Sequence, residues 1–268
     1  MKKVIIRSEK ENEYYQTELM TMRAFFNIHG PGCDEHYLVH ILRKSNSYLK
    51  ELSRVAEVDG KIVGAIFYLK AWINDGTKNH EIVTFGPLAI DPMYQNQGIG
   101  KLLLEETFKL VKKAKYPGIC IIGELDYYPK HGFKNAKDFK ITDEEGNNYD
   151  ALMVKETEPG SLNKIQGKFI ESDVFKNIDQ DKVILFNKNF PDYPMYKVKS
   201  QWLHKEKLGK VIVIEKDQYI VEYWEGYCPS VLSDKFKGDK PKVGDLVTFV
   251  KCNNQYQILM IEENLLNK

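Results

Sequence analysis

The pattern of apolar and polar positions along the chain predicts helices and strands in a defined order. Apolar residues recur three and four positions apart in residues 9–28, 35–45 and 98–115, which predicts helices. Alternating or fully apolar runs predict strands at residues 4–7, 53–58, 61–72, 81–90, 119–123 and 151–155. Asp59-Gly60 predicts a two-residue hairpin turn. This order is typical of an α/β fold, a mixed sheet with a central strand–helix–strand crossover.

The pattern changes after Pro159-Gly160. A strand at 167–175 and a short helix at 179–189 precede short strands at 210–215, 218–223, 245–251 and 255–261. Short strands at this spacing predict a small mainly-β domain, similar to an OB-like barrel. We therefore expect an α/β domain at 1–158, a connector at 159–196 and a small β-barrel-like domain at 197–268.

Composition narrows the class of protein. The 268 residues carry a formal net charge of +1, so no strong overall field attracts nucleic acid or a membrane. The sequence has no run of about 18 uncharged apolar residues, and its N-terminus turns polar too soon for a secretory signal. The four cysteines lie far apart and form no CxxC pair. A cytoplasmic protein without a membrane partner is expected.

Residues 88–101 carry the first chemical signal. A predicted strand ends at Ile90, and a loop with Gly98 and Gly100 opens the next predicted helix. The first N–H groups of a helix lack internal acceptors and can bind a pyrophosphate. Rival phosphate loops fit less well. A Walker loop needs Ser or Thr after Lys101, and the dinucleotide fingerprint needs a third glycine where Leu103 stands.

A second motif follows the next predicted strand and reads Tyr128-Pro129-Lys130-His131-Gly132-Phe133. Together the two motifs resemble the GNAT N-acetyltransferase superfamily. Its cofactor loop reads Gln/Arg-x-x-Gly-x-Gly/Ala, and its later signature is a tyrosine, three residues and Gly-Phe. The resemblance covers about residues 3–155, and the stretch 31–36 is similar to a bacterial branch with undefined acceptors. It implies an N-acetyltransferase that uses acetyl-coenzyme A (acetyl-CoA).

The resemblance also implies roles for individual residues. The backbone of Leu88 and Ile90 would pair with the pantetheine arm, and Tyr128 would protonate the departing sulfur. The implied pyrophosphate loop is Gln95, Asn96, Gln97, Gly98, Ile99, Gly100 and Lys101. The chemistry agrees, because amine attack on a thioester creates an oxyanion that a backbone N–H can stabilise. A phenol with a pKa near ~10 keeps its proton at neutral pH and can donate it.

Gly86-Pro87 interrupts the strand just before Leu88. Proline occurs in sheets at bulges or edges. Two interpretations stand: a bulge that makes room for the cofactor beside residues 119–123, or an ordinary edge irregularity.

Weaker candidates surround this segment. Glu81 or Glu124 could deprotonate the amine, directly or through water, or both could be solvated surface carboxylates. Asp34, Glu35 and His36 are candidates for the acceptor pocket. In the other interpretation, Asp34 caps a helix beside surface histidines. His36 and His40 share a helix face, but the absence of an obvious third ligand argues against a metal, and none is assigned.

The C-terminal domain has several interpretations. Lysines cluster near Trp202, namely Lys197, Lys199, Lys205, Lys207 and Lys210. Aromatic residues among lysines can bind single-stranded nucleic acid, but acidic residues follow closely, so nucleic acid is the less favoured partner. A lid, a homodimer contact or a protein-contact surface are the others. The favoured function is direct acetyl transfer to a primary amine of a small molecule or protein. The alternative is a non-catalytic acyl-CoA sensor with a C-terminal interaction module.

Overall fold

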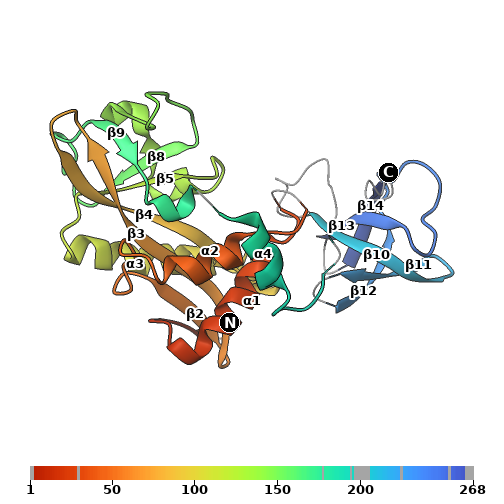
Figure 1. Ribbon diagram of the computed structural model, residues 1–268. Coiled ribbons are helices and arrows are strands. Elements are labelled where there is room, and N and C mark those ends of the chain that lie inside the picture. Colours follow the sequence, from red (N-terminus) through yellow and green to blue (C-terminus); the bar gives the residue numbers. More distant parts are fainter. Residues whose placement is uncertain are drawn as a thin grey trace. The chain divides into compact units, whose positions relative to one another are not determined.

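The computed structural model describes residues 3–28, 31–176, 178–193, 195, 206–223, 226–252 and 255–262. They form two compact units (Figure 1). The first contains residues 1–24 and 34–190, and the second contains residues 25–33 and 191–268. In the part of the chain that the structure describes, no helix has the length and apolar character needed to cross a membrane.

The first unit is built on one mixed sheet. Its strands are β1 (Val4–Arg7), β2 (Arg54–Val58), β3 (Lys61–Asn74), β4 (Asn79–Ile90), β5 (Gly118–Ile122), β6 (Lys134–Asn135), β7 (Ile141–Thr142), β8 (Leu152–Glu156) and β9 (Gly167–Ile170). The order is β1-β2-β3-β4-β5-β8-β6, and β9 pairs with β3 and β7. The β4–β5 pair is parallel, as the strand–helix–strand pattern predicted. Asp59 and Gly60 have φ angles of 50° and 78° and form the predicted hairpin turn between β2 and β3.

The helices of this unit are α1 (Tyr14–Phe25), α2 (Glu35–Leu42), α3 (Ile99–Lys113) and α4 (Gln180–Asn187). Short 3-10 turns are η1 (Glu11–Glu13), η2 (Pro92–Tyr94), η3 (Tyr128–His131), η4 (Ala136–Phe139) and η5 (Asp173–Phe175). Both faces of the central strands are buried. Val83 of β4 packs in one core cluster with Leu103 of α3, and its neighbour Ile82 packs in another with Phe169 of β9. The same holds for β5, because Ile119 and Ile121 lie in the first cluster and Cys120 lies in the second.

The sheet opens after a bulge in β4. Ile66 pairs with Leu88 and Tyr68 with Phe85, so Gly86-Pro87 stands opposite the single residue Phe67. The bulge in β4 is confirmed, and β4 lies between β3 and β5 in the strand order. Strand β4 pairs with β5 before the bulge, where Val83 is opposite Ile119. After the bulge, residues 88–90 pair only with β3 among the described strands.

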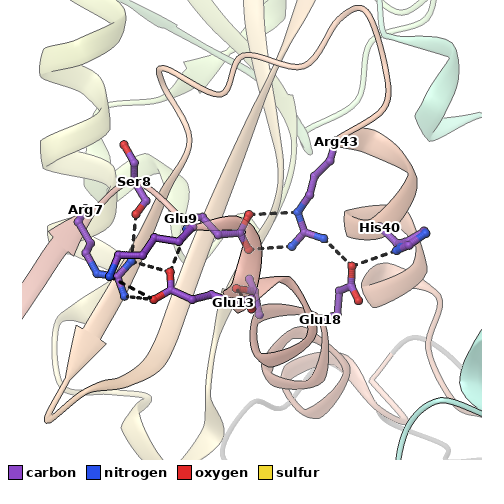
Figure 2. Close-up of polar contacts among 9 residues, drawn as sticks. Arg7, Ser8, Glu9, Glu13, Glu18, His40 and Arg43 are labelled. Carbon is purple, nitrogen blue, oxygen red and sulfur yellow. Dashed lines mark hydrogen bonds and ion pairs between the residues drawn. The ribbon is translucent and has the colours of Figure 1, made fainter.

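A buried ion network ties α1 and α2 to the segment after β1 (Figure 2). The Arg43 guanidinium donates to both carboxylate oxygens of Glu9, at 2.8 and 3.1 Å, and to Glu18 at 2.5 Å. Glu18 also contacts His40 Nδ1 at 3.1 Å. The Arg43 side chain lies over the Tyr14 ring, 4.0 Å from the centroid. The network fixes the two helices that precede the central strands.

The second unit contains a closed barrel, which confirms the predicted small β domain. Its strands are β10 (Glu206–Glu215), β11 (Gln218–Tyr223), β12 (Gly226–Leu232), β13 (Leu246–Cys252) and β14 (Gln255–Glu262). The order around the barrel is β10-β11-β12-β14-β13, and β12 pairs with β14 in parallel. The sequence did not predict β12, because Gly226 and Pro229 disfavour a strand.

The segment expected as a connector contributes to the first unit through residue 190. There β9 pairs with β3, and Asp179 caps α4 by accepting from Asp181 N and Lys182 N. Of the predicted lysine cluster, Lys197, Lys199, Lys205 and Trp202 lie outside the described residues.

Candidate cofactor and acetyl-transfer site

The opened strand end forms one wall of the candidate site. Leu88 and Ile90 are half-buried, and Ala89 between them is fully buried. Gly64 on β3 allows Ile90 to pack closely, because a Cβ there would lie 2.8 Å from Ile90 Cδ1. On the β5 side, the backbone of residues 88–90 is not paired with the neighbouring strand in the described sheet. It therefore offers hydrogen-bonding groups to an extended, amide-containing ligand.

The loop between β4 and α3 is held by its own side chains. Asp91 accepts from Met93 N at 3.0 Å, and Gln95 Nε2 donates to the Ile90 carbonyl at 3.2 Å. Gln97 Nε2 donates to the Met93 carbonyl at 3.0 Å. Asn96 has a φ of 60°. The side chains of Gln95 and Gln97 thus shape the loop.

Helix α3 begins directly after this loop. The first helical hydrogen bond runs from Leu102 N to the Gly98 carbonyl, at 3.0 Å. The N–H groups of Ile99, Gly100 and Lys101 precede it and have no acceptor within the helix. The Ile99 side chain is buried in the core, and the exposed Lys101 forms an ion pair with Glu105 at 3.7 Å. The helix therefore presents mainly backbone donors to an anion.

The two loop glycines serve different purposes. Gly98 has a φ of 82°, a left-handed conformation that favours glycine, and a Cβ there would meet nothing within 4 Å. A Cβ on Gly100 would lie 2.5 Å from the Tyr127 hydroxyl. A ligand can therefore approach the backbone closely only at Gly98. At Gly100 the space is taken by Tyr127.

Tyr128 lies in an aromatic pocket beside β5. Its ring centroid is 5.7 Å from that of Phe85 and 5.6 Å from that of Phe133. Gly123, at the end of β5, makes room for this ring, since a Cβ there would lie 2.6 Å from Tyr128 Cδ2. Burial raises the pKa of Tyr128 above its ordinary value, and the neighbouring Tyr127 and Glu124 raise it further. The phenol therefore keeps its proton throughout the neutral range.

The two candidate bases lie in different places. Glu124 is close to Tyr128, because its carbonyl accepts from Tyr128 N at 3.1 Å and its charge raises the pKa of that phenol. Glu81 lies near the start of β4, where it forms an ion pair with Lys70 at 3.5 Å. Its charge also contributes to the raised pKa of Tyr116, which follows α3. Glu81 and Phe85 are four positions apart on one strand, which corresponds to about 13 Å. The structure thus brings Glu124, but not Glu81, next to Tyr128.

The predicted acceptor residues lie at the start of α2. His36 is fully buried under α4, with its Nε2 2.6 Å from Asn187 Oδ1, and burial lowers its pKa to about 4. Asp34 makes no side-chain cap, which corrects the capping interpretation, and its carboxylate accepts from Gln180 Nε2 at 3.2 Å. Burial raises the pKa of Glu35 to about 7, against the backbone hydrogen bonds that lower it.

Two contributors to the site were missed in the sequence. Gly123 attracted no attention because its role depends on a ring five positions later. Phe175 of η5 lies 3.3 Å from the position of a Cβ on Gly86, so it stands beside the bulge. The same short turn contacts α2, which carries Glu35. A segment beyond the predicted α/β domain therefore reaches the opened strand.

The geometry of the site indicates the kind of ligand that it can bind. A parallel strand pair that separates at a bulge, facing the N-terminus of a helix and a buried tyrosine, suits a ligand with an amide-containing arm and a pyrophosphate. That combination is found in coenzyme A (CoA).

Comparison with known proteins agrees. Residues 49–135 match the family model described as "Acetyltransferase (GNAT) domain". The uncharacterized N-acetyltransferase YjhQ of Escherichia coli K12 is 30% identical over 97 residues, which is 36% of this chain and 54% of YjhQ. The chain thus spans about half the length of that relative. The uncharacterized N-acetyltransferase YhbS of the same strain is 24% identical over 160 residues, 55% of this chain and 93% of YhbS.

Solved structures show the same fold. The crystal structure of YhbS from Escherichia coli in complex with CoA aligns with a TM-score of 0.59 and 22% identity, covering 67% of this chain and 95% of that one. A GNAT family acetyltransferase from Brucella melitensis in complex with acetyl-CoA aligns with a TM-score of 0.52 and 24% identity, covering 65% and 99%. Residues 49–135 of the first unit are thus similar to a GNAT acetyltransferase domain, and the first unit shares the fold of these structures.

Proposed function

We propose that the protein is an acetyl-CoA-dependent N-acetyltransferase that transfers acetyl directly to a primary amine of a small molecule or a protein. The observation that carries this proposal is the position of Tyr128. Its protonated phenol is enclosed by Phe85, directly before the β4 bulge, and by the Gly123 end of β5. A protein that only binds the cofactor has no need of a proton donor there.

The residues of the strand and loop fit the cofactor. The free backbone edge of residues 88–90 would bind the pantetheine amides, and the N–H groups of Ile99, Gly100 and Lys101 would bind the pyrophosphate. The open space at Gly98 lets the ligand approach the backbone. When bound, acetyl-CoA supplies the acetyl group as a thioester that a neutral amine can attack.

The residues around the bulge then serve the transfer. Backbone N–H groups of the opened β4 would stabilise the negative charge that develops on the carbonyl oxygen. As the carbon–sulfur bond breaks, Tyr128 donates its proton to the sulfur. The attacking nitrogen loses one proton, which restores the phenol through solvent or a nearby carboxylate. The balance therefore needs no further reactant.

Two carboxylates of the first unit can receive the amine's proton. Glu124 lies beside Tyr128. Glu35 has a pKa of about 7, which suits a base that works at neutral pH, and its helix contacts η5 beside the bulge. Both also favour an acceptor that arrives as a cation.

The test measures thiol release from acetyl-CoA with a panel of primary amines, together with CoA affinity by calorimetry. Tyr128→Phe should lower kcat by about 100-fold or more without changing CoA affinity. Tyr149→Phe, which changes an exposed tyrosine in the loop between β7 and β8, serves as the control. Normal turnover by Tyr128→Phe would remove this tyrosine from the mechanism. Tight CoA binding without turnover on any amine would leave the sensor alternative.

A further inference from the structure

A group of basic side chains lies beyond the pyrophosphate loop, around His131 in η3. Burial lowers the pKa of His131, and the charges of Lys101, Lys155 and Lys130 lower it further, while Glu105 opposes them. These lysines come from α3, β8 and η3, so three separate elements bring positive charge to one place.

Lys155 is the central member of this group. Its Nζ donates to the His131 carbonyl at 2.9 Å and lies 5.1 Å from the centroid of the Phe108 ring. The side chain is half-buried, and burial lowers its pKa. It forms no ion pair with any carboxylate among the described residues. An ammonium has three donors, so two remain for an anion at a partly dehydrated position.

The second sequence motif keeps this ammonium in place. A Cβ on Gly132 would lie 2.6 Å from Lys155 Nζ, and Gly132 has a φ of 84°. The glycine of the signature therefore allows the turn and also leaves room for the lysine.

The basic group continues from the proposed pyrophosphate site. The ring centroids of Tyr127 and His131 are 4.6 Å apart, and the Tyr127 hydroxyl occupies the space beside Gly100, where a Cβ would lie 2.5 Å from it. One aromatic side chain thus connects the start of α3 to His131. In CoA, the ribose bound to the pyrophosphate through its 5′ oxygen carries a further phosphate on its 3′ oxygen. An anion site next to the pyrophosphate loop matches that arrangement.

We propose that Lys155, together with Lys101, Lys130 and His131, binds the ribose 3′-phosphate and so makes the protein select CoA over its 3′-dephosphorylated form. This inference rests on the proposed function, because it assumes that CoA binds at the β4–α3 loop. Charge-assisted hydrogen bonds of this kind correspond to an affinity difference of about 10-fold to 100-fold.

The experiment uses the full-length protein and calorimetric titration with CoA and with dephospho-CoA at low salt. The wild-type protein should bind CoA at least about tenfold more tightly. Lys155→Met keeps the apolar stem against Phe108 and removes the charge, and Lys101→Ala with Lys130→Ala removes the exposed charges. Each variant should weaken the binding of CoA by a larger factor than the binding of dephospho-CoA, and so lower the ratio of the two affinities. Lys109→Ala, on an exposed position of α3 where it pairs with Glu106, is the matched control.

The outcomes separate the two proposals. Equal wild-type affinities for the two ligands would overturn the 3′-phosphate inference and leave the proposed function intact. Binding of neither ligand would overturn both. If Lys155→Met fails to fold, the variant that combines Lys101→Ala and Lys130→Ala still tests the proposal. A ratio of CoA affinity to dephospho-CoA affinity equal to that of the wild type would contradict the role of Lys101 and Lys130.

Discussion

Replacing Arg43 by alanine tests whether the buried ion network holds the first unit together. The side chains of Arg43, Glu9 and Glu18 are only 5%, 7% and 7% exposed. Without the guanidinium, two carboxylates stay buried without their main partner. Breaking a buried pair in this way costs about 3–5 kcal/mol. Loss of the contact with the Tyr14 ring adds about 1 kcal/mol.

Arg7 provides a matched comparison in the same part of the fold. It binds Glu13 and Glu57 at 2.7 Å each, but its side chain is 21% exposed and its partners are 13% and 21% exposed. Water can therefore solvate the carboxylates once the cation is gone. We expect Arg7→Ala to cost only about 1 kcal/mol. Arg43→Lys keeps the charge but loses the fork that contacts both carboxylates, so its cost should fall between the two.

The assay is urea denaturation followed by tryptophan fluorescence. Trp72 lies in β3 of the first unit, so Trp202→Phe with Trp224→Phe leaves a reporter for that unit alone. In this background Arg43→Ala should lower the free energy of unfolding by at least about 2 kcal/mol more than Arg7→Ala does. Equal losses for the two variants would refute the argument that burial, rather than the number of ion pairs, sets the cost.

Three further substitutions test the site. Gly123→Ala should displace the Tyr128 ring and lower kcat about 100-fold, as much as Tyr128→Phe does. The double variant should have the same kcat as either single variant. Additive losses of kcat would show that the two residues act independently. Gly100→Ala should weaken CoA binding because its Cβ meets the Tyr127 hydroxyl, and adding Tyr127→Phe should restore the affinity in calorimetry; no restoration would place the effect elsewhere. Glu35→Gln should stabilise the fold by on the order of 2 kcal/mol at pH 8. The folded pKa of about 7 lies above the ordinary 4.5, so the stability that Glu35 contributes is present below pH 4.5 and is lost as the pH rises through 7. Melting temperatures of the wild type and of Glu35→Gln at pH 4 and pH 8 check this. An equal difference in melting temperature at both pH values would contradict the raised pKa.

The sequence predicted those parts of the fold that depend on local pattern. The strand at residues 4–7 and the hairpin at Asp59-Gly60 appear where expected, since side-chain alternation and turn residues act over a few positions. Strand β12 was missed because Pro229 argues against a strand, although its position opposite Ile220 in the closed barrel accommodates it. Closure of the barrel supplies pairing that no local pattern reveals.

The same distinction holds for the site. The loop residues were identifiable because their chemistry depends on a strand, a loop and a helix that are consecutive in the sequence. His36 was expected near the acceptor, but Asn187, 151 positions away, covers it and explains its burial. Tyr127 lies outside both sequence motifs, yet its hydroxyl limits the space beside Gly100. Such roles depend on contacts between distant segments, which one sequence does not reveal.

Within the first unit, the residues proposed for the cofactor and those close to the acceptor side come from different parts of the sequence. Apart from Lys155, the cofactor candidates lie between residues 88 and 132, inside the matched region that ends at residue 135. Phe175 and α4 lie beyond it, yet one reaches the β4 bulge and the other covers α2. An acetyltransferase needs a common site for the cofactor and a variable one for the amine. We infer that acceptor selection depends on η5 and α4, so that changes at Phe175 should alter KM for the amine while leaving KM for acetyl-CoA close to that of the wild type.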